Sequence, residues 1–172
     1  AKASRVFVRR IFIDEELALI ESQLQDVTQI ICDIYSRFLF ESSVFEARPQ
    51  EFLDADRLCQ LMLEAQKKAY GDGLDQTCLH PYMWLCKGHY YSGSLSFYNF
   101  PYAFGGLFAR GLYAKYQQEG EKFVPLYKEM LHATSVNDVE DTAKIDLTDK
   151  AFWRQGLQSL ADEIDLFCDL VK

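Results

Sequence analysis

The chain has 172 residues, of which 49% are hydrophobic, and it carries a formal net charge of −8. This length can bury one sizeable core, so we expect a single unit over residues 1–172. The negative charge argues against a nucleic-acid partner, because phosphate binding needs a basic face. With no apolar run of 18 residues, no membrane partner is expected either. Five cysteines without a CxxC pair indicate a reducing, cytoplasmic location.

The first half of the chain predicts two amphipathic helices. Asp14 is the expected cap of a helix of about thirty residues that ends at Pro49. Its apolar stripe consists of Leu17, Ile20, Leu24, Val27, Ile31, Ile34 and Phe38. Asp54 is the expected cap of the second helix, and Gly71 its stop signal. The inner side of this second helix is predicted to hold Leu58, Leu61 and Met62.

The second half predicts further helices. Helical spacing begins near Phe97, with Pro101 in the first turn, and stops at Gly120. The next helix is expected to face inward with Phe123, Leu126, Tyr127, Met130 and Leu131. Ser135 is the expected cap of a small acidic helix, and Thr148 or Asp149 that of the last one. The last stripe consists of Trp153, Leu157, Leu160, Ile164, Phe167 and Val171.

No segment alternates with period two, so the sequence predicts an all-α fold with one irregular segment. That segment begins residues 80–116, which hold 12 of the 25 aromatic residues and five of the nine glycines. A tyrosine can pack its ring and still donate a hydrogen bond from its hydroxyl. Glycine allows positive φ or close backbone approach. We therefore expect a substrate-facing loop that leads into a buried helix.

One of the three histidines stands out. His132 falls at a helix end and His80 precedes a proline, so local structural roles suffice for both. His89 lies in KGHYYSGS, between glycines and directly before two tyrosines. An imidazole there can donate a hydrogen bond to a substrate carbonyl or oxyanion, although a structural role fits the residues equally well. No HExxH, GxSxG or Walker motif accompanies it.

Several long blocks of the sequence resemble a known family. They are HPYMWLCKGHYYSGSLSFYNFPYAFGGLFARGLYAKYQQEG, FVPLYKEML, VEDTAKIDLTD and FWRQGL. These blocks look like the C-terminal region of oligoendopeptidase F-type members of the thimet-oligopeptidase-like family of zinc metallopeptidases. YSRFLFESSVFE also resembles the helix that follows the family's zinc-binding elements. The resemblance extends from about residue 17 to the C-terminus.

The resemblance implies a zinc metalloendopeptidase that hydrolyses oligopeptides inside an α-helical bowl. The family binds zinc through the two histidines of HExxH and a glutamate on the following helix. HExxH is missing here, and Asp14, Glu15 and Glu16 do not match the third-ligand motif. We therefore expect a C-terminal fragment of a larger catalytic domain, which the missing initiating Met also suggests. Zinc would bind in the intact enzyme and not to this chain, which alone would be inactive.

The resemblance also implies roles for particular residues. His89 matches the family histidine that binds the substrate backbone and stabilises the tetrahedral oxyanion. Tyr98 and Tyr102 are the expected catalytic tyrosines. The expected substrate-binding residues are Tyr90, Tyr91, Gly88 and Gly93, whose glycines would let the loop close over a peptide.

Two other interpretations stay open. A non-catalytic helical module could bind a peptide or protein partner through its aromatic stretch. The long helices could also mediate oligomerisation through a face left bare by truncation. In the leading interpretation, the partners are an oligopeptide substrate and the rest of the same catalytic domain.

Overall fold

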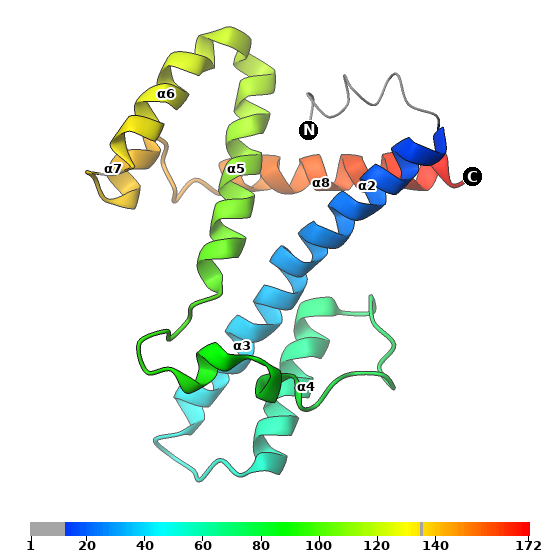
Figure 1. Cartoon of the computed structure of the whole chain (residues 1–172). Helices are drawn as coiled ribbons and strands as arrows, with labels where there is room; N and C mark the ends of the chain where they lie inside the picture. Colours follow the sequence, from blue (N-terminus) through cyan, green and yellow to red (C-terminus); the bar gives the residue numbers. More distant parts are fainter. Residues whose placement is uncertain (1–12, 135) are drawn as a thin grey trace. The chain divides into compact units, whose positions relative to one another are not determined.

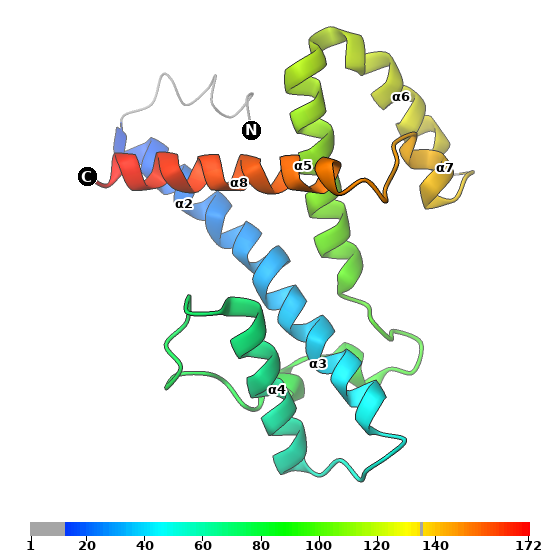
Figure 2. The same cartoon turned by 180° about the vertical axis from the view of Figure 1, so that it is seen from behind.

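The regular elements of the structure, a computed structural model that describes residues 13–134 and 136–172, are all helices (Figures 1 and 2). The all-α prediction is therefore confirmed. Within these residues, no helix has the length and hydropathy that crossing a membrane would require. The contacts divide the chain into two compact units. The central unit comprises residues 25–104, and the terminal unit comprises the described residues before 25 together with residues 105–172. A single unit over residues 1–172 stays a prediction.

The first predicted helix contains a π-helical turn. It consists of α2 (Ile13–Thr28), the turn η1 (Gln29–Asp33) and α3 (Ile34–Ala47). Apolar spacing does not mark the buried face of α3, because that face includes polar and charged side chains. The buried residues of α3 are Ile34, Ser36, Arg37, Phe40 and Glu41. The inward prediction for Phe38 is therefore wrong, and its side chain is 39% exposed. The capping role of Asp14 lies outside the described side chains.

Helix α4 (Ala55–Tyr70) follows its sequence signals closely. The Asp54 carboxylate accepts a hydrogen bond from the Arg57 backbone N–H at 2.8 Å, as a capping residue should. Gly71 ends the helix with φ +57°, a conformation that glycine adopts without strain. The core against α3 consists of Phe40, Leu61, Met62 and Ala65. Both boundary predictions and the inward placement of Leu61 and Met62 are confirmed.

The aromatic segment after α4 packs against this same core. It contains two short 3-10 turns, η2 (Met83–Cys86) and η3 (Gly88–Tyr91), before α5 (Phe100–Glu119) begins. The buried Gln66 side chain accepts from the His80 N–H at 3.1 Å and donates to the His80 carbonyl at 2.8 Å. Helix α5 begins three residues later than expected, because Phe97 has φ +55° and cannot continue a right-handed helix.

Besides the described residues before 25, the terminal unit contains most of α5 and the helices after it. These are η4 (Gly120–Phe123), α6 (Val124–Ala133), α7 (Val139–Ala143) and α8 (Lys150–Leu170). Their core consists of Leu112, Phe123, Met130 and Phe152. Gly120, at φ +62°, ends α5 as predicted, and Asp149 caps α8 by accepting from the Ala151 N–H at 2.8 Å. The predicted cap Ser135 lies outside the described residues.

The predicted apolar stripes of α6 and α8 are only partly buried. The inward predictions are wrong for Tyr127, Leu131, Leu157, Ile164 and Val171, which are all exposed. Helix α8 instead buries Phe152, Gly156, Leu160 and Glu163. Two of these are not hydrophobic side chains, so a search for apolar spacing could not find that face.

Two glycines explain how α8 approaches α5, which it crosses in both views (Figures 1 and 2). A Cβ on Gly156 would lie 3.1 Å from the Leu107 carbonyl oxygen. A Cβ on Gly111 would lie 2.4 Å from the Phe152 ring. That ring is itself packed against Phe108, with ring centroids 5.7 Å apart. Close contact between these helices therefore depends on the missing side chains.

We expect Gly111→Ala to lower the free energy of unfolding by about 1–3 kcal/mol, because the new methyl group overpacks the Phe152 ring. Gly105→Ala is the matched control in the same helix, where an added Cβ meets nothing within 4 Å. It should raise stability by about 0.5–1 kcal/mol through helix propensity. Urea unfolding of the three proteins measures both effects. Equal shifts for the two variants would contradict the packing argument.

Candidate functional site

The candidate site of the central unit begins with two buried charges on α3. Arg37 is 8% exposed and Glu41 is 7% exposed. Buried charges need partners, since removing an ion from water costs several kcal/mol. Arg37 pairs with Asp33, one helical turn earlier, and its Nη1 donates to Asn99 Oδ1 at 3.2 Å. The guanidinium thus links α3 to the end of the aromatic segment.

Asn99 continues this chain of contacts to the histidine that the sequence singled out. Asn99 is 6% exposed, and its Nδ2 lies 2.5 Å from His89 Nε2. Burial lowers the pKa of His89, and the nearby Arg37 and Lys87 charges lower it further, while Glu41 acts in the opposite direction. The lowered pKa favours the neutral form of His89 at pH 7.

Tyr98 lies beside this histidine and contacts a second tyrosine, Tyr102. The rings of His89 and Tyr98 have centroids 6.0 Å apart. The Tyr98 and Tyr102 hydroxyls are hydrogen-bonded at 2.8 Å, and this bond raises the pKa of Tyr102. Both side chains are about half exposed, at 45% and 51%. The structure therefore brings the three predicted catalytic residues together and leaves the phenols open to a ligand.

A strained turn orients this tyrosine pair. Phe97 has a left-handed backbone conformation, which typically costs about 1–3 kcal/mol for a side chain of this kind. Its N–H donates to the buried Glu41 carboxylate at 2.7 Å. Its ring contacts Phe38 and Phe45, with centroids at 5.6 and 5.3 Å. These interactions hold the turn directly before Tyr98.

The four predicted substrate-binding residues occupy different environments. Tyr90 is half-buried, donates from its hydroxyl to the Arg37 carbonyl at 3.4 Å, and packs edge-on against Phe40. Burial raises the pKa of Tyr90. Tyr91 is 62% exposed, and its hydroxyl donates to the Trp84 carbonyl at 3.4 Å. An added Cβ on Gly88 or Gly93 would meet nothing within 4 Å.

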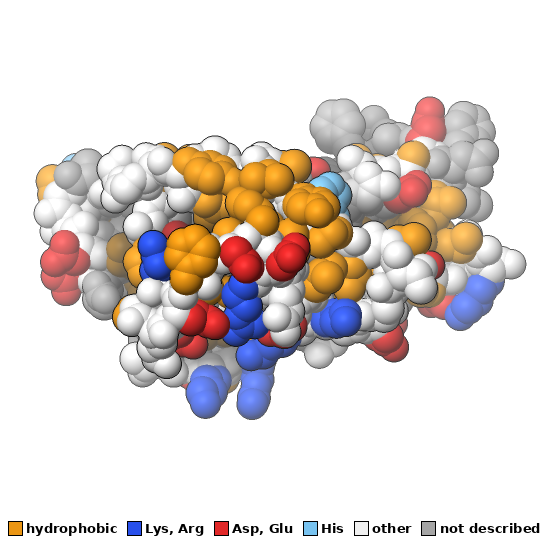
Figure 3. Space-filling view, turned by 90° about the horizontal axis from the view of Figure 1, so that it is seen from below, with side chains coloured by type: hydrophobic (Ala, Val, Ile, Leu, Met, Phe, Trp, Pro, Cys, Tyr) orange, Lys and Arg blue, Asp and Glu red, His pale blue; other side chains and the backbone are white. Residues whose placement is uncertain are grey.

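The aromatic segment exposes several large apolar and aromatic side chains. Its exposed large side chains are Tyr82, Leu85, Tyr91, Leu95, Tyr98, Phe100 and Tyr102. Figure 3 shows one face of the molecule on which hydrophobic side chains gather next to acidic and basic groups. A surface of this composition can bind a ligand that is apolar in part and still needs hydrogen bonds.

The sequence interpretation missed Arg37, Glu41 and Asn99. A signal was present, because Asp33, Arg37 and Glu41 follow one another at steps of four and share one helix face. Such alternating charges equally fit a solvated surface face. The burial of Arg37 and Glu41 follows from packing against residues much later in the chain.

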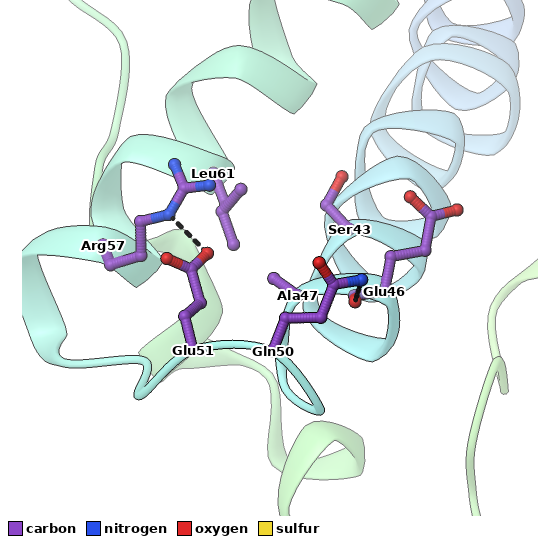
Figure 4. Close-up of a pocket in the computed structure, with 7 residues that line it drawn as sticks. All are labelled: Ser43, Glu46, Ala47, Gln50, Glu51, Arg57 and Leu61. Atoms are coloured by element: carbon purple, nitrogen blue, oxygen red, sulfur yellow. Dashed lines mark hydrogen bonds and ion pairs between the residues drawn. The ribbon is translucent and has the colours of Figure 1, made fainter.

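A separate hollow of about 580 Å³ lies where α3 ends and α4 begins. Its lining residues are Ser43, Glu46, Ala47, Gln50, Glu51, Arg57 and Leu61 (Figure 4). Arg57 Nε is already paired with the Glu51 carboxylate at 3.0 Å. The Arg57 cation is therefore already paired, and the lining contains no imidazole or phenol. For these reasons the hollow is not a candidate site.

Metal binding finds no support in the side chains at hand. In the described parts of the chain, no group of three or more His, Cys, Asp or Glu residues is arranged to hold a metal ion. These residues therefore do not fit a zinc centre. The expectation that zinc ligands belong to another segment stays a prediction.

We expect Arg37→Ala to lower the free energy of unfolding by about 3 kcal/mol, because it leaves Asp33 and Asn99 without their buried partner. Arg48→Ala is the matched control on an exposed residue of the same unit and should change stability by less than about 0.5 kcal/mol. Urea unfolding followed by circular dichroism compares them. A loss for Arg37→Ala no larger than that for Arg48→Ala would show that the network is not structural.

Comparison with known proteins adds no relative to this description. No family model, curated protein or solved structure matches the chain. The resemblance to zinc metallopeptidases, which rests on the sequence blocks, therefore stays a prediction.

Proposed function

We propose that this chain supplies the substrate-binding and oxyanion-stabilising wall of a zinc metalloendopeptidase that hydrolyses oligopeptides. The enzyme would be of the oligoendopeptidase F type in the thimet-oligopeptidase-like family. One observation carries the proposal: His89 lies beside the hydrogen-bonded pair Tyr98 and Tyr102, and the two phenols are half exposed. The sequence blocks that resemble the family contain the same three residues.

The proposal includes parts that lie outside this sequence. The zinc-binding HExxH segment belongs to the remainder of the same catalytic domain, and the helices described above form one side of a bowl around the substrate. The Gly- and Tyr-rich segment is the substrate loop of that bowl. The five cysteines are unpaired, which agrees with a cytoplasmic location.

The chemistry of the three side chains suits the stabilisation of an oxyanion. When a nucleophile adds to a peptide carbonyl, negative charge develops on the carbonyl oxygen, and positioned donors stabilise that charge more than they stabilise the substrate. One such donor typically contributes about 3–4 kcal/mol. A neutral imidazole and a protonated phenol are both donors at pH 7. Since one of the two phenol hydroxyls donates to the other, the proton of the accepting hydroxyl remains for the substrate.

The substrate surface favours extended, unfolded peptides. An extended peptide exposes its backbone carbonyls to the His89 and Tyr donors, and it exposes its side chains at the same time. Exposed rings such as Tyr91 and Phe100 can contact those side chains without strict sequence selection. Peptide hydrolysis with broad specificity fits this arrangement.

In the intact protein, we expect His89→Ala and Tyr98→Phe each to lower kcat by about a hundredfold or more on a fluorogenic oligopeptide. KM should change little, because the lost hydrogen bond forms mainly in the transition state. Tyr35→Phe removes an exposed hydroxyl elsewhere in the central unit and serves as the matched control with unchanged kinetics. A change in KM alone would exclude a role in transition-state stabilisation, and absence of any hydrolysis by the intact protein would exclude the peptidase.

A second candidate function is a non-catalytic module that binds a peptide or protein through the aromatic surface. The 62% exposure of Tyr91 favours it, since large exposed rings are common anchors of protein interfaces. This function predicts peptide binding that Tyr91→Ala weakens, together with an open reading frame that lacks HExxH. The two candidates therefore differ in the upstream coding sequence and in turnover.

A further inference from the structure

We propose that Asn99, held in place by Arg37, fixes His89 in the tautomer that carries its proton on Nδ1. In this arrangement, Nδ1–H is the donor that His89 presents to a ligand, and Arg37 and Asn99 are positioning residues. The tautomer itself is independent of the peptidase proposal. Only the identity of the ligand, a peptide carbonyl, rests on the proposed function.

The orientation of the Asn99 amide is determined by Arg37. Arg37 Nη1 and Asn99 Oδ1 are 3.2 Å apart. A guanidinium has five N–H donors, no acceptor, and does not lose its proton in proteins. Only the oxygen of the amide can therefore face it. The carboxylate of Asp33, which pairs with the same guanidinium, keeps Arg37 in position.

The orientation of the amide determines the role of the His89 nitrogen that faces it. With Oδ1 directed at Arg37, the NH₂ group of Asn99 lies 2.5 Å from His89 Nε2. The NH₂ group can only donate, so Nε2 must accept with its lone pair. A proton on Nε2 would place N–H against N–H in a site where Asn99 is 6% exposed. The neutral ring then carries its single proton on Nδ1.

Other charged and aromatic groups also lie near the His89 ring. The Arg37 and Lys87 cations oppose a positive charge on His89, as does burial, and the Glu41 carboxylate favours it. The net effect lowers the pKa of His89, in agreement with an Nε2 atom that is committed as an acceptor. The rings of Tyr90 and Tyr98 flank the imidazole at centroid distances of 4.2 and 6.0 Å. Within the described residues, Nδ1 has no hydrogen-bond partner, so its proton is free for a ligand.

The tautomer can be read directly from the ring nitrogens. The chain has three histidines, so long-range ¹H–¹⁵N spectra of the ¹⁵N-labelled protein are simple, and His80→Gln and His132→Gln assign them. At pH 7.5 we expect an unprotonated Nε2 and a protonated Nδ1 for His89. A protonated Nε2 in the wild-type protein would overturn the inference without the need for any variant at the site.

Asn99→Asp reverses the polarity of the contact with almost no change in shape. A carboxylate accepts from both Arg37 and His89, so the proton of the neutral ring should move to Nε2. The pKa of His89 should rise by about one unit or more, because the new charge favours the imidazolium. Gln50→Glu adds the same charge at an exposed position of the same unit and should leave tautomer and pKa unchanged. An unchanged tautomer in Asn99→Asp, or equal pKa shifts of His89 in both variants, would show that Asn99 does not fix the tautomer of His89.

The same spectra separate this inference from the proposed function. If His89 carries its proton on Nδ1 and the intact protein hydrolyses no peptide, the tautomer inference stands and the peptidase proposal fails. If hydrolysis depends on His89 while its proton lies on Nε2, the peptidase proposal stands and the tautomer inference fails.

Discussion

The guanidinium of Arg37 is the constraint on which the candidate site depends. It lies in the interior of the central unit, where a permanent cation must be matched by acceptors. Its own helix supplies one through Asp33, and Asn99 supplies the other from 62 positions further along the chain. Because this cation cannot be neutralised, it determines which way the Asn99 amide faces. That orientation in turn determines what His89 can accept and donate.

Side chains of the helices hold the irregular segment in the same manner. Gln66 binds both backbone groups of His80, and Glu41 accepts from the N–H of Phe97. Buried backbone groups outside regular structure need such partners. The result is a segment whose regular structure is limited to two short 3-10 turns, but whose ends are anchored on α3 and α4. A site supported in this way keeps its geometry better than one on a free loop.

Sequence reasoning succeeded where local chemistry decides the structure. The helix boundaries at Asp54, Gly71, Gly120 and Asp149 depend on a side-chain cap or a positive φ within a few residues, and all four were predictable. Burial was less predictable. Phe38 is exposed because α3 buries Arg37 and Glu41 on its inward face, and α8 buries Gly156 and Glu163 in place of part of its apolar stripe. Glu163 is matched there by Arg110, with a nitrogen–oxygen distance of 3.2 Å.

For the candidate site, the sequence alone determined which chemical groups are present: one histidine among glycines, followed by closely spaced tyrosines. Tertiary structure decided that Arg37 is buried, that it meets Asn99, and that Asn99 meets His89. The reason is that these contacts join residues up to 62 positions apart. Such contacts depend on how α3 packs, whereas composition and spacing report only what each residue can do once it has arrived.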